Sequence, residues 1–213
     1  MNNLIEPLGE ETEIEIDEYI SALQEAHHYL VAKYRQHMEQ MYRGQLKPTS
    51  TFGRDVKRNK VYLSGDDKPT MVGSDAQSIV EIINQLANIE RLIDALIWAR
   101  DNGATTVMQC NPTTSSEGHD LVVSGSGGVS VFEISDTMST YGEAKVKNDL
   151  NTLFDCECDY CRKPHKSFIV ISEEASEYLP KDDYETSKGN LVHSGQVHVL
   201  DMPGNTHIAE FYK

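Results

Sequence analysis

Residues 118–135 read GHDLVVSGSGGVSVFEIS, and this stretch decides the fold. Two runs rich in β-branched and apolar residues, 120–124 and 128–135, flank the glycine-rich segment 125–128. Runs of this kind, joined by a short glycine-rich turn, are typical of a β-hairpin. The stretch therefore predicts two antiparallel strands that lie next to each other.

The segments on either side of this hairpin predict an α/β fold. Apolar residues recur at three- and four-residue steps in 14–45, 75–101 and 140–154, which predicts three helices. Ser74 and Gln77 suggest a capping box for the second helix. Further strands are predicted at 60–63, 105–110, 166–172, 197–201 and 206–212, and residues 1–12 read as a frayed acidic leader. The order helix, three strands, helix, strand favours a mixed central sheet with helices on its faces.

Charge is distributed unevenly along the chain. The 213 residues carry a formal net charge of −15, whereas 33–60 hold eight basic residues against two acidic ones, a local charge of +6. A basic segment on an acidic body is compatible with binding to a polyanion. The candidate contacts are Arg43, Lys47, Arg54, Lys57, Arg58 and Lys60. The other interpretation of this segment is a solvated helix face followed by a loop.

Several classes of protein are excluded by composition. No apolar run approaches the roughly 20 residues that a membrane span needs. The first residues lack the basic and then apolar pattern of a secretory signal. Three of the four cysteines lie within six residues, a poor spacing for disulfides. We therefore expect a cytoplasmic protein that does not contact a membrane.

Two acidic residues lie beside or within the apolar runs of the hairpin. Asp120 begins the first run, and Glu133 lies inside the second. Burying a carboxylate costs several kcal/mol unless it is paired or holds a metal ion. Because a hairpin brings the two positions to one end of the sheet, they suit Mg²⁺, which takes one or two carboxylates together with phosphate oxygens and waters. The alternative is that both acids occupy ordinary exposed positions at a strand end or turn.

This arrangement resembles the PD-(D/E)XK nuclease superfamily over residues 75–172. The resemblance implies an αβββαβ restriction-endonuclease-like core in 61–213, preceded by a helical and basic extension in 1–60. It also implies metal-binding roles for Asp120 and Glu133. Ser135 stands where the family has its lysine. Some members supply this lysine from the following helix, where Lys145 and Lys147 lie. We prefer Lys147, because it shares a helical face with Glu143 and Leu150.

A cysteine-rich segment follows the third predicted helix. Cys156, Cys158, Cys161 and His165 place four possible zinc ligands within ten residues. A Cys-x-x-Cys turn is a common half of a structural zinc site. Cys110 or His119 could replace one of the four in space, and reduced cysteines without a metal are the alternative.

These observations favour a Mg²⁺-dependent endonuclease that cleaves DNA. An enzyme of the restriction type would cut both strands as a homodimer. Asp120 and Glu133 would hold the ion and Lys147 or Lys145 would assist the water, while zinc would be structural. The alternative is a non-catalytic module that binds nucleic acid or protein on a degenerate nuclease fold. Ser135 and the charge of −15 favour this alternative.

Overall fold

The computed structural model describes residues 5–8, 12–43, 60–111, 119–135, 142–200 and 205–213. Its helices are α1 (Ile16–Tyr42), α3 (Ile79–Asp101), α4 (Gly142–Asp155) and the short 3₁₀ helix η1 (Glu174–Tyr178). The large sheet contains β1 (Ile14–Glu15), β4 (Ala104–Cys110), β5 (Leu121–Gly125), β6 (Gly128–Ser135), β7 (His165–Ser172), β8 (Tyr184–Glu185), β9 (Leu191–Val199) and β10 (Thr206–Tyr212). A small second sheet pairs β2 (Lys60–Tyr62) with β3 (Ala76–Ser78).

The eight strands of the large sheet follow the order β1-β4-β5-β6-β7-β10-β9-β8. Strands β6 and β7 run parallel, because α4 carries the chain back between them, and the other described neighbours are antiparallel. The predicted α/β class is confirmed, as is the predicted order helix, three strands, helix, strand, here α3-β4-β5-β6-α4-β7.

The hairpin that the sequence predicts forms from β5 and β6. Gly125 pairs with Gly128, so the turn consists of Ser126 and Gly127. Gly128 has a φ of 93°, a left-handed conformation that favours glycine. Because successive side chains of a strand point to opposite faces, Phe132 and Glu133 of β6 face different layers.

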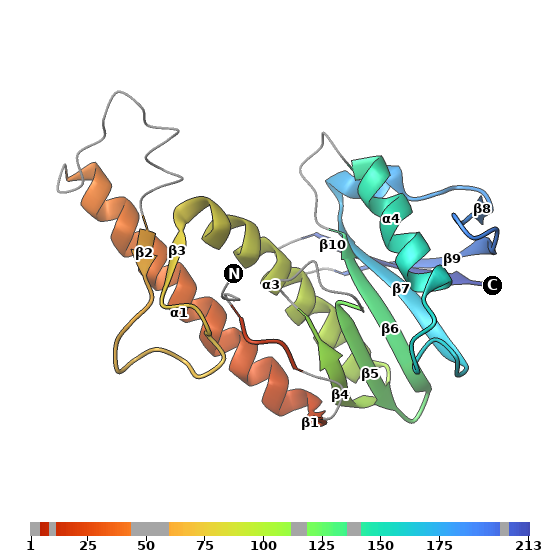
Figure 1. The fold of residues 1–213 in the computed structure, drawn as a ribbon, viewed down its shortest axis with the longest axis horizontal. Helices are drawn as coiled ribbons and strands as arrows, with labels where there is room; N and C mark the ends of the chain where they lie inside the picture. Colours follow the sequence, from red (N-terminus) through yellow and green to blue (C-terminus); the bar gives the residue numbers. More distant parts are fainter. Residues whose placement is uncertain (1–4, 9–11, 44–59, 112–118, 136–141, 201–204) are drawn as a thin grey trace.

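Helices cover both faces of the sheet (Figure 1). Helices α1 and α3 pack together on one face, where Phe132, Phe168 and Ile208 join their apolar side chains in one core. Helix α4 covers the other face, over Val131 and Ile169. Within the described ranges, none of the helices combines the length and apolarity that crossing a bilayer requires.

Several boundaries differ from the sequence predictions, among them the strand predicted at 197–201, which is β9 and begins six residues earlier, at Leu191. Helix α3 begins one turn later than predicted, because the Ser78 hydroxyl accepts from the Glu81 amide and donates to the Glu81 carboxylate, and residues 76–78 pair as β3. Residues 5–8 are not frayed: Ile5 and Leu8 are buried and form bridges to Val72 and Cys110. Helix α1 also contributes to the core beside α3, mainly through buried side chains between Ile16 and Leu30.

Candidate metal centre and carboxylate cluster

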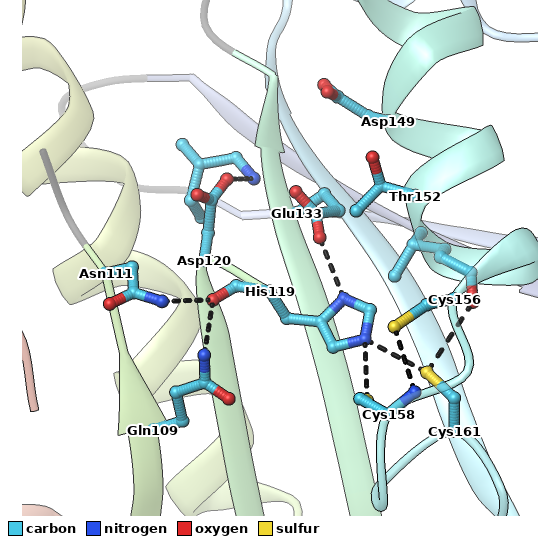
Figure 2. Close-up of polar contacts among 12 residues, drawn as sticks. Gln109, Asn111, His119, Asp120, Glu133, Asp149, Thr152, Cys156, Cys158 and Cys161 are labelled. Atoms are coloured by element: carbon cyan, nitrogen blue, oxygen red, sulfur yellow. Dashed lines mark hydrogen bonds and ion pairs between the residues drawn. The ribbon is translucent and has the colours of Figure 1, made fainter. Parts of the chain in front are cut away.

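His119, just before β5, lies between a group of cysteines and a cluster of acidic side chains, which together form the candidate site (Figure 2). Its side chain is fully buried. Its backbone carbonyl accepts hydrogen bonds from the side-chain amides of Asn111 (3.2 Å) and Gln109 (3.5 Å), which lie at the end of the neighbouring strand β4. These bonds hold the backbone so that the imidazole points toward the loop that follows α4.

Three cysteines from that loop surround one nitrogen of this imidazole. His119 Nε2 lies 3.0 Å from Cys161 Sγ and 3.6 Å from Cys158 Sγ. Cys156 Sγ accepts from the Cys158 amide at 3.4 Å. The ligand atoms of His119, Cys156, Cys158 and Cys161 all lie within 4.8 Å of one another, a group that could hold a metal ion.

The structure replaces one of the four ligands that the sequence predicts. His165 begins β7, and its Nδ1 contacts the carbonyl of Lys163 at 2.8 Å, outside the group. His119 takes its place, one of the two replacements that the spacing left open. Cys110, the other, is buried beside Tyr19 in the core under α1. His119 reaches the cysteines because β5, β6 and β7 are neighbours in the sheet, which no spacing within the sequence reveals.

The second nitrogen of His119 contacts a carboxylate. His119 Nδ1 lies 2.9 Å from Oε1 of Glu133, which is only 4% exposed. Burial lowers the pKa of His119 to about 4, so the ring is neutral near pH 7. A neutral imidazole that donates Nδ1–H to a carboxylate and turns Nε2 toward soft ligands has the form of a metal-binding histidine.

Glu133 belongs to a cluster of three acids, in which Glu133 and Asp149 are buried and Asp120 is partly buried. Asp120 accepts a hydrogen bond from the Ile134 amide at 2.8 Å, and its carboxyl interacts with that of Glu133. Asp149 of α4 is 2% exposed, and its Oδ2 makes no hydrogen bond within the part of the chain that the structure describes. The hydroxyl of Ser135 is also buried at the same end of β6, and it lies close enough to Asp149 to lower the pKa of that carboxyl.

Burial raises the pKa of each acid in this cluster. The pKa of Asp120 rises to about 6, because burial outweighs the hydrogen bond from Ile134. Burial, and then the neighbouring Asp120 and Asp149, raise the pKa of Glu133 well above its ordinary value. The pKa of Asp149 is raised by burial and lowered in part by Lys145. The three acids therefore resist full ionisation without a further positive charge.

Lys145 is the basic side chain that the described residues place in this cluster. Its Nζ lies 2.5 Å from Asp149 Oδ1 and 3.4 Å from the Ile134 carbonyl. Lys147, the candidate that the sequence favoured, pairs instead with Glu143 at 2.5 Å on the exposed side of α4. The buried side of α4 is marked by Val146, Asp149 and Leu153, and Lys145 lies next to it.

Asp149 was missed by the sequence reasoning, although the sequence contains a signal for it. It stands between Val146, Leu150 and Leu153 on the apolar stripe of α4. An acid at such a position is buried with the stripe and needs a partner. Lys145, four residues earlier, is the partner that helical spacing provides.

The basic segment lies apart from these residues. Arg43 ends α1 in an exposed ion pair with Glu39 at 3.0 Å, and Lys60 is exposed on β2. Lys47, Arg54, Lys57 and Arg58 lie outside the described residues. The end of α1 and β2 stand at the opposite end of the molecule from α4 (Figure 1).

Comparison with models of protein families, with curated protein sequences and with solved structures finds no match for this chain. The resemblance to PD-(D/E)XK nucleases therefore rests on the residues and on the order of elements, and it stays a prediction.

Proposed function

We propose that the protein is a nuclease that uses a divalent cation, Mg²⁺, to hydrolyse phosphodiester bonds in DNA. Asp120 and Glu133 would hold the ion, with Asp149 close by, and Lys145 would act beside them.

The observation that carries this proposal is the charge of the cluster. Among the described residues, three carboxylates share one ammonium group, that of Lys145: Glu133 and Asp149 are buried and Asp120 is partly buried. With all four groups ionised and His119 neutral, the cluster has an excess of two negative charges. A divalent cation supplies the missing charge, and Oδ2 of Asp149, which makes no hydrogen bond to the described residues, fits an additional ligand or a bound water. Carboxylate oxygens are the ligands that Mg²⁺ prefers.

The order of elements agrees with the predicted resemblance. Asp120 directly precedes β5, Glu133 lies on β6, and β6 runs parallel to β7 after the crossover through α4. The family lysine, absent at Ser135, has a counterpart in Lys145 from α4, which reaches the carbonyl of Ile134 next to that position. This supports an intact site and argues against the degenerate module that Ser135 alone suggested.

The side chains divide the chemistry between them. A bound Mg²⁺ supplies a water of lowered pKa and stabilises charge on the phosphate. Asp120 is held by the Ile134 amide and Glu133 by His119, so both carboxylates are oriented before any substrate arrives. The Lys145 ammonium is partly exposed and adjacent to them, where it can orient the attacking water or neutralise a phosphate oxygen.

The cysteine group is the second part of the proposal. One imidazole and three sulfurs form a set of four that suits tetrahedral Zn²⁺ and leaves no position for water. We assign it a structural role, in which zinc would attach the loop after α4 to the start of β5. Contact of Arg43 to Lys60 with DNA phosphates, and a homodimer that cuts both strands, remain parts of the proposal that rest on sequence alone.

The test is cleavage of supercoiled plasmid, single-stranded DNA and RNA with Mg²⁺, Mn²⁺ or EDTA. We expect cleavage in Mg²⁺ or Mn²⁺ and none in EDTA. Glu133→Gln and Lys145→Met should each reduce the rate about 100-fold or more, because each removes a group that acts on the developing charge. Lys147→Met is the matched control on the same helix and should cleave at the wild-type rate.

Absence of cleavage by the wild type, also on a DNA library of diverse sequence, would contradict the proposal. Binding of nucleic acid that is equal in Mg²⁺ and EDTA would then favour the non-catalytic module.

A further inference from the structure

His119 touches both parts of the site, the cysteines through Nε2 and the carboxylate cluster through Nδ1. The ring is fully buried, and the bonds to its own carbonyl from Asn111 and Gln109 hold its backbone. Figure 2 shows Oε1 of Glu133 directed at the imidazole and the other carboxylate oxygen directed away from it, toward the side of Asp120 and Asp149.

We infer that zinc bound by the cysteines positions Glu133, through His119, for the second cation. A metal ion on Nε2 requires the ring proton to be on Nδ1. That proton then donates to Oε1 of Glu133 at the observed 2.9 Å and leaves the other oxygen for the cation. Without zinc, the proton can move to Nε2 and bond to a cysteine sulfur, and Nδ1 then no longer donates to Oε1 or fixes which oxygen of Glu133 faces the ring.

The two metal sites are therefore coupled, and His119 is a positioning residue. Among the described residues, the His119 ring provides the contact that joins the cysteines to Glu133. Coupling between binding sites is reciprocal, so each cation should strengthen the binding of the other by the same factor. Loss of the partner of a metal-binding histidine typically costs about 10- to 100-fold in metal affinity. The inference rests on the proposed function only in taking the second cation to be the catalytic one.

The first test measures Zn²⁺ affinity by competition with a chromophoric chelator, in reducing buffer without Mg²⁺. Glu133→Gln and Asp149→Asn each remove one acid from the same buried cluster, but only Glu133 contacts His119. We expect Glu133→Gln to weaken Zn²⁺ binding about 10-fold and Asp149→Asn not to weaken it. Equal Zn²⁺ affinity in the wild type and both variants overturns the inference, and so does equal weakening in both variants.

The second test removes the contact between His119 and Glu133 but retains the zinc site. His119→Cys would complete a set of four thiolates, which also binds zinc tetrahedrally, but it has no proton to give Glu133. We expect zinc to be retained at the wild-type stoichiometry while Mn²⁺ affinity, measured by electron paramagnetic resonance, falls about 10-fold. Unchanged Mn²⁺ affinity in a zinc-loaded, folded His119→Cys protein overturns the inference. If this variant does not fold, the comparison of Glu133→Gln with Asp149→Asn still decides it.

Failure of the proposed function gives a different result. A wild type that cleaves no nucleic acid contradicts the nuclease, yet the Zn²⁺ affinities of the two acid variants still test the link through His119. Conversely, metal-dependent cleavage by the wild type together with identical Zn²⁺ affinities in the wild type and both variants would support the nuclease and contradict the coupling through His119.

Discussion

Phe132 and Glu133 are neighbours on β6, and they enter opposite faces of the same sheet. Phe132 stacks on Phe168, with ring centroids 4.9 Å apart, and meets Trp98 edge-on under α3. Glu133 is buried to a similar degree on the face that α4 covers, among Asp120 and Asp149. One face is packed for stability, and the other buries charges that cost stability, which is expected where a site is built for a ligand.

Buried acid alone does not mark such a site, as Asp94 shows. Asp94 of α3 lies on the apolar face and is as buried as many core residues. Its carboxylate accepts from the Thr206 hydroxyl and lies 4.0 Å from Arg91, so one acid faces one base. In the α4 layer, the described residues place three acids against one base, and among them Oδ2 of Asp149 makes no hydrogen bond. The imbalance of charge, and not burial, distinguishes the candidate site.

The largest expected effect is a difference in stability between variants of Phe132 and of Glu133, the two neighbours on β6. Phe132→Ala should lower the free energy of unfolding by about 3–5 kcal/mol, because it removes a fully buried ring and leaves a cavity. Glu133→Gln should cause no loss in the protein without divalent cations, because the raised pKa of Glu133 already disfavours its charge. Urea denaturation at pH 7.5 measures the free energy of unfolding of both variants. A large decrease for Glu133→Gln would contradict the expected difference between the two faces of the sheet.

A smaller effect should depend on pH. The pKa of Asp120 is about 6 in the folded protein, above its ordinary value of 3.8, so protonation favours the folded state. This contribution is complete below about pH 3.8 and is lost as the pH rises through 6. Asp120→Asn, which can still accept from Ile134, should therefore gain stability relative to the wild type between pH 4 and 7, by at most about 3 kcal/mol.

Denaturation curves of both proteins over that pH range, without divalent cations, measure the difference. A difference that stays constant with pH would mean that Asp120 is ionised throughout, and the charge argument would fail. Adding Mg²⁺ at pH 7 should stabilise the wild type and not the variant, because an ion binds the folded state alone.

The smallest expected change in stability comes from removing an exposed charge of α4, and it shows how little such a charge contributes. Lys147→Ala should change the free energy of unfolding by no more than about 0.5 kcal/mol, because its pair with Glu143 is exposed to water. The same denaturation measurement checks it. A loss comparable with that of Phe132→Ala would mean that this side of α4 is packed in a way that the structure does not show.

Local patterns predicted the elements well. The apolar steps of α1 and α3, and the alternating runs of β5 and β6, are signals within one segment, and each element formed within a few residues of its predicted bounds. The start of α3 was misplaced because two Ser-x-x-acceptor patterns follow each other directly, and the one at Ser78 caps the helix, with Glu81 as its partner.

The candidate site was predicted only in part, because its contacts join distant segments. Asp120 and Glu133 came from a local hairpin, and the two acids do interact. His119 was preferred less than His165 because sequence distance to the cysteines favours the latter, whereas sheet order brings the former to them. Lys145 and Lys147 could not be separated until the sheet defined which side of α4 is buried.

The central claim is that His119 separates two cation sites of different chemistry, one with sulfur ligands and one with oxygen ligands. Anomalous diffraction from crystals grown with Zn²⁺ and soaked in Mn²⁺, recorded at the edges of both metals, tests it most directly. The account predicts a zinc peak among His119, Cys156, Cys158 and Cys161, and a manganese peak on the other side of the imidazole, at Asp120 and Glu133. A zinc peak elsewhere, or no manganese at the carboxylates of a zinc-loaded crystal, would contradict it.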